Sequence, residues 1–118
     1  MKRVLIVDDE EDIRLLARLL LRQCCEVAEA SSVAEAWELM ETFSPDVLLL
    51  DVRLPGQDGW SMLQSLRDRT EGKKMRVIML SAHAVSDAPE QARALGADGY
   101  ITKPFRAEEL LELIEGST

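Results

Sequence analysis

Three aspartates stand where they would form one acidic site. Asp8 and Asp9 follow the apolar run 4–7, and Asp51 follows the apolar run 47–50. If these runs are neighbouring strands of a parallel sheet, their carboxyl ends meet at one crevice, where ligands of such sheets bind. Taken singly, an acid after a strand more often caps a helix or forms a turn. Three acids at two strand ends beside one crevice instead predict a shared pocket.

A pocket of three carboxylates is expected to bind a cation. At ~5 Å and an effective dielectric constant of ~20, each carboxylate pair repels by roughly 3 kcal/mol. A few hard oxygen ligands suit Mg²⁺, or another divalent ion such as Mn²⁺. Such an ion relieves the repulsion and orients a phosphoryl group. Because a carboxylate is also a nucleophile, we expect Asp51 to accept a phosphoryl group while Asp8 and Asp9 hold the ion.

Two further polar side chains follow later strands. Ser81 comes after the run 77–80, and its hydroxyl has the chemistry to hydrogen-bond a phosphoryl oxygen. Lys103 follows a weaker strand predicted at 100–102, and its ammonium would pair with the carboxylates or the phosphoryl group. The alternatives are a helix-capping or loop serine and a solvated surface lysine. Lys103 precedes Pro104, so this peptide bond is either cis or trans, and base rates favour trans.

The elements that must position these residues alternate along the chain. Apolar runs predict strands at 4–7, 47–50 and 77–80, with weaker strands at 26–30 and 100–102. Helical spacing of apolar residues predicts helices at 11–23, 32–42, 60–69, 87–95 and 107–115. Ser32 and Glu35 form a plausible capping box, and Gly96 is placed to end the fourth helix. This alternation predicts an α/β fold with helices on both faces of a parallel sheet.

Length and charge limit the classes of function. The 118 residues predict a single domain over 1–118. With 22 acidic and 14 basic residues the formal charge is −8, so we expect no nucleic-acid binding by this domain alone. The apolar runs are too short for a signal peptide or a membrane span, which favours a cytoplasmic protein without membrane contact. The adjacent Cys24 and Cys25 are expected to be reduced and at least partly packed.

Four motifs together resemble the receiver domain of two-component response regulators. They are Val7-Asp8-Asp9-Glu10, Asp51 with the downstream Leu54-Pro55-Gly56-Gln57-Asp58-Gly59, Ser81-Ala82, and Lys103-Pro104-Phe105. Each motif is weak alone, but they occur in order at predicted strand ends, and the likeness runs over residues 2–114. The resemblance implies a flavodoxin-like three-layer sandwich, with a five-stranded parallel sheet of order 2-1-3-4-5 and five helices.

The resemblance also implies a metal site. Asp9, Asp51 and the backbone carbonyl of Arg53 would bind Mg²⁺ directly, and Asp8 would act through water. Arg53 and His83 occupy positions that in this family tune how fast the phosphoryl group is hydrolysed. The alternative for these two residues is a place at the solvent-facing rim.

The same resemblance implies a signalling role. A histidine kinase or a phosphotransfer protein would donate the phosphoryl group to Asp51. Lys103 would pair with that group, Ser81 would move toward it, and Tyr100 would turn inward as an aromatic switch. The alternative for Tyr100 is a half-buried strand tyrosine. The surface of the last two helices and the strand between them would then change its affinity for an output domain or target protein, or form a homodimer.

Two other functions fit a fold of this class. A Mg²⁺-dependent phosphohydrolase with an aspartyl nucleophile would need a general acid two residues past Asp51, where Arg53 stands, and a cap insertion. A flavin-binding module would need a Ser/Thr/Gly-rich phosphate loop after the first strand, where residues 8–12 are acidic. We therefore expect a signalling switch that is not an enzyme acting on other substrates.

Overall fold

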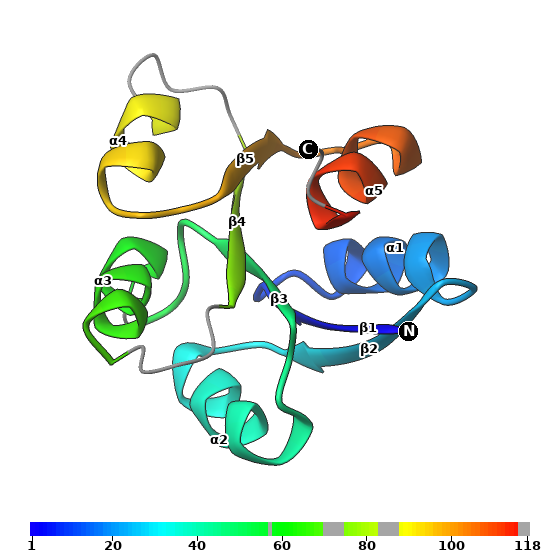
Figure 1. Cartoon of the computed structure of the whole chain (residues 1–118), viewed down its shortest axis with the longest axis horizontal. Coiled ribbons are helices and arrows are strands. Elements are labelled where there is room, and N and C mark those ends of the chain that lie inside the picture. Colours follow the sequence, from blue (N-terminus) through cyan, green and yellow to red (C-terminus); the bar gives the residue numbers. More distant parts are fainter. Residues whose placement is uncertain (57, 70–74, 83–87, 116–118) are drawn as a thin grey trace.

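Strands and helices alternate in the computed structural model, which describes residues 1–56, 58–69, 75–82 and 88–115 (Figure 1). The strands are β1 (Lys2–Val7), β2 (Cys25–Ala30), β3 (Val47–Asp51), β4 (Arg76–Ser81) and β5 (Gly99–Thr102). The helices are α1 (Glu11–Leu21), α2 (Val33–Phe43), α3 (Gly59–Arg69), α4 (Ala88–Ala94) and α5 (Ala107–Glu115). Each predicted strand and helix is therefore present, and only the ends differ; Asp87, the expected first residue of the fourth helix, lies outside the described residues.

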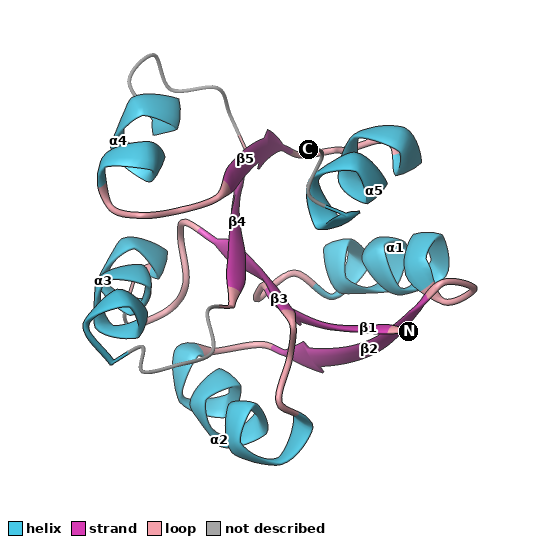
Figure 2. Cartoon of the chain, viewed as in Figure 1, coloured by secondary structure: helices cyan, strands magenta, loops and turns pink. Residues whose placement is uncertain are grey.

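The strands form one parallel sheet of order β2-β1-β3-β4-β5 (Figure 2). This confirms the predicted order 2-1-3-4-5. In the register of the sheet, Val7 lies beside Leu50 of β3. Asp51, the last residue of β3, lies beside Leu80. Residues that follow β1 and β3 are therefore neighbours, although more than forty positions separate them in the sequence.

Helices cover both faces of the sheet, which makes three layers. On one face, alternate strand residues such as Ile6 and Leu49 pack with α1 and α5. On the other face, Leu5, Leu48 and their neighbours pack with α2, α3 and α4. Figure 1 shows α1 and α5 together on one side of the strands. Burial on both faces explains why the central strands read as continuous apolar runs rather than alternating ones.

The helix ends follow local rules, with two departures from the prediction. The Ser32 hydroxyl accepts a hydrogen bond from the Glu35 N–H, as expected of a capping residue. The returning carboxylate of Glu35 binds the N–H and hydroxyl of Ser31, however, one residue earlier than a capping box requires. Gly96 ends the α4 region at φ +98°, as predicted. Helix α1 ends at Leu21, before the expected end at position 23.

The two cysteines are reduced but differ in exposure. Cys25, the first residue of β2, is buried, whereas Cys24 in the preceding turn is exposed. Cys25 is packed as expected, and the thiol of the more exposed Cys24 still lies 3.6 Å from the Cys25 thiol and 3.7 Å from the Leu21 carbonyl oxygen. Burial, together with the Cys24 thiol 3.6 Å away, raises the pKa of Cys25 to about 11.

Candidate functional site

The three predicted aspartates converge at the carboxyl ends of β1 and β3. One carboxylate oxygen from each of Asp8, Asp9 and Asp51 lies within 4.8 Å of the others. Asp8 is fully buried and Asp51 is 4% exposed, while Asp9 faces solvent. Two buried carboxylates with one exposed carboxylate form a donor set of hard oxygens, open on one side, which suits a divalent cation.

Burial and repulsion act together on Asp51. Removal from water is the larger cause, and the negative charge of Asp8 adds to it, so the pKa of Asp51 rises to about 6. The positive charge of Lys103 opposes this rise without cancelling it. A cation beside Asp51 would stabilise the ionised form of this carboxylate.

Lys103 lies at the centre of the acidic cluster rather than on the surface. Its Nζ is 2.9 Å from Asp8 Oδ2, 3.0 Å from Glu10 Oε1 and 3.6 Å from Asp51 Oδ2. Its side chain is 7% exposed. Burial alone would lower the pKa of Lys103, but the hydrogen bonds to Asp8 and Glu10, together with the negative charges of Asp51 and Asp8, outweigh burial and raise it. Lys103 is therefore a buried ammonium, and the alternative of a solvated lysine is wrong.

The loop after β5 brings Lys103 to this position. The Lys103–Pro104 peptide bond is cis, which resolves the alternative that the sequence left open. The Lys103 N–H donates to the Ser81 carbonyl at 2.7 Å and so ties this loop to the end of β4. Phe105 is buried in the core beneath α5 and fixes the other side of the loop.

The loop after Asp51 is shaped by two glycines of the predicted motif. Gly56 has φ +81°, a backbone conformation that favours glycine. A Cβ on Gly59 would lie 2.1 Å from the Asp51 carbonyl oxygen, so only glycine allows α3 to begin this close to Asp51. Asp58 caps that helix, because its Oδ1 accepts from the Ser61 N–H at 2.8 Å. The motif thus folds the loop back against Asp51.

A cavity of about 580 Å³ opens at the cluster. Its lining includes Asp9, Asp51 and Arg53, and Ser81 borders it from the end of β4. The Arg53 N–H is 3.4 Å from Asp51 Oδ1, which places Arg53 beside Asp51. Ser81 is buried at 8% exposure. The cavity is open and has room for a phosphoryl group beside the carboxylates.

Two other predicted residues have different outcomes. Tyr100 is half-buried on β5, beside Met79 in the register, and packs at the edge of the core shared with α4. This position fits both a switch residue and a half-buried strand tyrosine, so the switch role stays a prediction. His83 lies outside the described residues.

The site also includes residues whose roles the sequence did not show. Glu10 binds Lys103 from the first loop, and Trp60 lines the cavity from the first turn of α3. The run of acids after β1 pointed to Glu10, but nothing in the sequence indicated that its side chain contacts a lysine more than ninety positions away. Trp60 gave no signal, because an aromatic residue near a helix start usually packs in the core.

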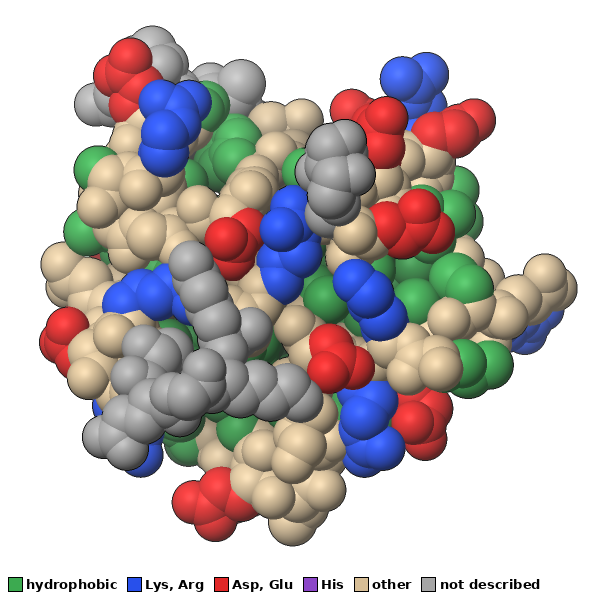
Figure 3. Space-filling view, viewed as in Figure 1, with side chains coloured by type: hydrophobic (Ala, Val, Ile, Leu, Met, Phe, Trp, Pro, Cys, Tyr) green, Lys and Arg blue, Asp and Glu red, His purple; other side chains and the backbone are tan. Residues whose placement is uncertain are grey.

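The surface carries charges of both signs. On the face drawn in Figure 3, acidic and basic side chains are interspersed among apolar ones rather than gathered into a basic patch. Within the described parts of the chain, no helix has the length and apolar character that a membrane crossing requires. Among the described residues, Asp8, Asp9 and Asp51 form an acidic group at the strand ends.

The chain is similar to known proteins over nearly its whole length. Residues 4–115 match the family described as response regulator receiver domain. The chain is 34% identical over 114 residues to the chemotaxis protein CheY of Halobacterium salinarum, covering 96% of this chain and 93% of that protein. It is 36% identical over 113 residues to the DNA-binding transcriptional regulator NtrC of Escherichia coli, covering 95% of this chain but 24% of NtrC.

Solved structures show the same architecture. The chemotaxis protein CheY4 of Vibrio cholerae superposes with a TM-score of 0.87 at 29% identity, covering 98% of this chain and 97% of that one. The BeF3-activated receiver domain of DrrB superposes with a TM-score of 0.86 at 25% identity, covering 98% and 95%. Both the sheet order and the placement of the helices therefore follow a known pattern.

Proposed function

This chain belongs to the family of response regulator receiver domains, and we propose that Asp51 is its phosphoryl acceptor. The supporting observation is the cluster itself: three carboxylates within 4.8 Å of one another, beside the buried ammonium of Lys103. A phosphoryl group on Asp51 would enter the cavity between the carboxylates and Ser81. The donor is a histidine kinase or a phosphotransfer protein.

Asp51 acts as the nucleophile in the proposed transfer. A carboxylate oxygen of Asp51 attacks the phosphorus of a phosphohistidine, and a new P–O bond forms as the P–N bond breaks. The electron pair of the P–N bond returns to the imidazole nitrogen of the donor, which takes up a proton. Mg²⁺, held by Asp9, Asp51 and the Arg53 carbonyl with Asp8 acting through water, would neutralise charge on the transferred group. Mn²⁺ has suitable ligand chemistry for the same place.

Lys103 and Ser81 would bind the phosphoryl group on Asp51. The ammonium of Lys103, now 3.6 Å from Asp51 Oδ2, pairs with a phosphoryl oxygen, and the Ser81 hydroxyl donates to another. Phosphorylation adds negative charge at Asp51 and biases two pre-existing states. Tyr100 turns inward in the phosphorylated state, while Arg53 and His83 tune hydrolysis.

The surface of α4, β5 and α5 is the proposed output. Its change on phosphorylation alters affinity for an output domain, a target protein or a second copy of this chain. NtrC, a relative, is named as a DNA-binding regulator, and this chain covers 24% of its length.

We also propose that residues 1–118 form one receiver domain. This domain acts in the cytoplasm, and by itself it binds neither nucleic acid nor membrane.

Labelling with radioactive acetyl phosphate tests the acceptor. We expect the wild-type chain to take up label with Mg²⁺ and not with EDTA. Asp51→Asn removes the nucleophile and keeps the shape of the side chain, so it should take up none. The matched control is Asp12→Asn, which removes an exposed acid of α1 outside the cluster and should label as wild type. Equal labelling of wild type and Asp51→Asn would overturn the assignment.

A further inference from the structure

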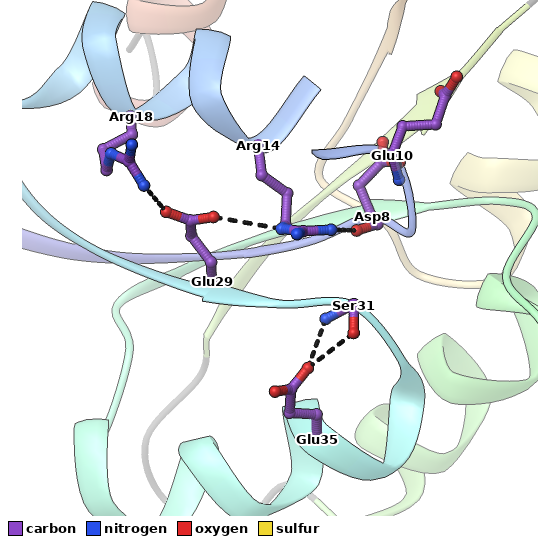
Figure 4. A network of polar contacts seen from close by, with 7 residues as sticks. All are labelled: Asp8, Glu10, Arg14, Arg18, Glu29, Ser31 and Glu35. Atoms are coloured by element: carbon purple, nitrogen blue, oxygen red, sulfur yellow. Dashed lines mark hydrogen bonds and ion pairs between the residues drawn. The ribbon is translucent and has the colours of Figure 1, made fainter. Parts of the chain in front are cut away.

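Arg14 of α1 connects the acidic loop to the edge of the sheet. Its Nη1 donates to the backbone carbonyl of Asp8 at 2.7 Å, and its Nε donates to Glu29 Oε1 of β2 at 3.2 Å. Figure 4 shows the guanidinium lying between these two acceptors. The Arg14 side chain is 16% exposed, so water competes weakly for both hydrogen bonds.

The hydrogen bond from Arg14 fixes the peptide unit that joins Asp8 to Asp9. A peptide unit is planar, so fixing its carbonyl oxygen also fixes its N–H and limits the direction in which Asp9 leaves the strand. Other contacts already hold Asp8 itself: its N–H donates to the Ala30 carbonyl at 3.1 Å, and its Oδ1 accepts from the Glu10 N–H at 2.9 Å. Arg14 thus holds the carbonyl of the peptide unit through which the chain continues to the exposed Asp9.

Arg14 is itself held in place. Glu29 lies on β2 beside Ile6 of β1, so its backbone position is set by the sheet. A second arginine, Arg18, pairs with the other carboxylate oxygen of Glu29, as Figure 4 shows. The planar guanidinium of arginine presents several donors in a fixed fork and can serve the Asp8 carbonyl and Glu29 together, whereas a lysine ammonium is a point charge on a flexible stem.

We infer that Arg14 is a positioning residue for the metal site, an inference that rests on the proposed function. Two properties of Arg14 act on a bound cation in opposite directions. Its positive charge repels the cation, which weakens binding. Its hydrogen bond to the Asp8 carbonyl holds the loop with Asp9 in the geometry that binding needs, which strengthens binding. The second property dominates, so Arg14 strengthens cation binding.

The opposite signs make a sharp test with Mg²⁺ alone. The dissociation constant for Mg²⁺ is measured by titration calorimetry, and Trp60, which lines the cavity, offers a fluorescence signal as a second readout. We expect Arg14→Gln to raise the dissociation constant by about tenfold, the lower end for loss of an outer partner of a metal ligand. Arg14→Lys keeps the charge but loses the fork, so we expect a similar rise.

Arg22→Gln is the matched control. It removes a positive charge from the exposed C-terminal end of the same helix, and Arg22 makes no contact with Asp8 or Glu29 among the described interactions. We expect its dissociation constant to stay within about twofold of wild type. Tighter or unchanged Mg²⁺ binding in Arg14→Gln would overturn the inference. A wild-type value for Arg14→Lys would do so too, because this variant keeps the charge and loses the fork, so the value would show that the fork adds nothing to Mg²⁺ binding.

Stability measurements distinguish a positioning role of Arg14 from a purely structural one. Urea denaturation in EDTA reports whether each variant is folded. If Arg14→Gln is unfolded, the dissociation constant of Arg14→Lys provides the test. A purely structural role would lower the stability of the metal-free protein and leave the dissociation constant of the folded fraction unchanged, which would contradict the inference.

If the wild-type chain binds no Mg²⁺, the metal part of the proposed function fails, and the inference with it. If the wild type binds and the Arg14 variants match it, only the inference fails.

Discussion

Asp51→Asn should stabilise the metal-free protein at neutral pH. In the folded state the pKa of Asp51 rises from 3.8 to about 6, because the carboxylate is buried and lies near Asp8. Holding this group ionised therefore costs about 3 kcal/mol of folding free energy once the pH is well above 6. Asparagine has the same shape without the charge, so the variant avoids this cost.

The sign of the pH dependence follows from proton binding. Between pH 3.8 and about 6, the folded state holds the Asp51 proton more often than the unfolded state does. The wild type therefore loses stability relative to Asp51→Asn as the pH rises through this window. We expect the advantage of the variant to be about 3 kcal/mol at pH 7.5 and about 1.5 kcal/mol at pH 5.

Urea denaturation in EDTA at these two pH values measures the difference. Asp12→Asn is the control, and it should change the free energy of unfolding by no more than about 0.5 kcal/mol, as is usual for an exposed position. Added Mg²⁺ should reduce the advantage of Asp51→Asn, since the ion binds the wild-type cluster more tightly. The reasoning is refuted if Asp51→Asn is no more stable than wild type at pH 7.5, or if its advantage is larger at pH 5.

Three further changes probe the site. Asp9→Asn should remove most of the Mg²⁺-induced rise in melting temperature, whereas Asp12→Asn should keep it; an unchanged rise in Asp9→Asn would place the ion elsewhere. Lys103→Gln leaves buried carboxylates without their ammonium, so urea denaturation in EDTA should show a free energy of unfolding that is lower by about 3 kcal/mol; an unchanged value would mean that the ion pairs add nothing to stability. Gly59→Ala should cost about 1 to 3 kcal/mol in the same assay, because its Cβ would lie 2.1 Å from the Asp51 carbonyl oxygen; wild-type stability would contradict this close approach.

Much of the fold could be predicted because the central strands are covered on both faces. Such strands read as continuous apolar runs, and the acids that end them stand out. Asp8 and Asp51 were predicted to meet because strand order and register bring the ends of β1 and β3 together. That prediction did not depend on the direction or length of any side chain. The weaker strand β2 was harder to place, since it stands at one end of the strand order and includes the charged residues Glu26 and Glu29.

The contacts that could not be predicted depend on side-chain direction. Lys103 binds Glu10 as well as Asp8, and nothing in the sequence says which acid a flexible ammonium will reach. Arg14 reads as one more polar residue of an amphipathic helix, and its hydrogen bond to the Asp8 carbonyl depends on the distance between α1 and the loop. Both cysteines were expected to be at least partly packed, but the sequence did not indicate that Cys25 is buried while Cys24 is the more exposed of the two.

Locating the phosphoryl group along the chain tests the central claim most directly. The protein is treated with acetyl phosphate and Mg²⁺, and borohydride then reduces any aspartyl phosphate to homoserine, which mass spectrometry of peptides assigns to a residue. We predict homoserine at position 51 alone, with none when EDTA replaces Mg²⁺. Homoserine at Asp8 or Asp9, or none at any position under conditions in which Mg²⁺ is bound, would contradict the assignment of Asp51 as the acceptor.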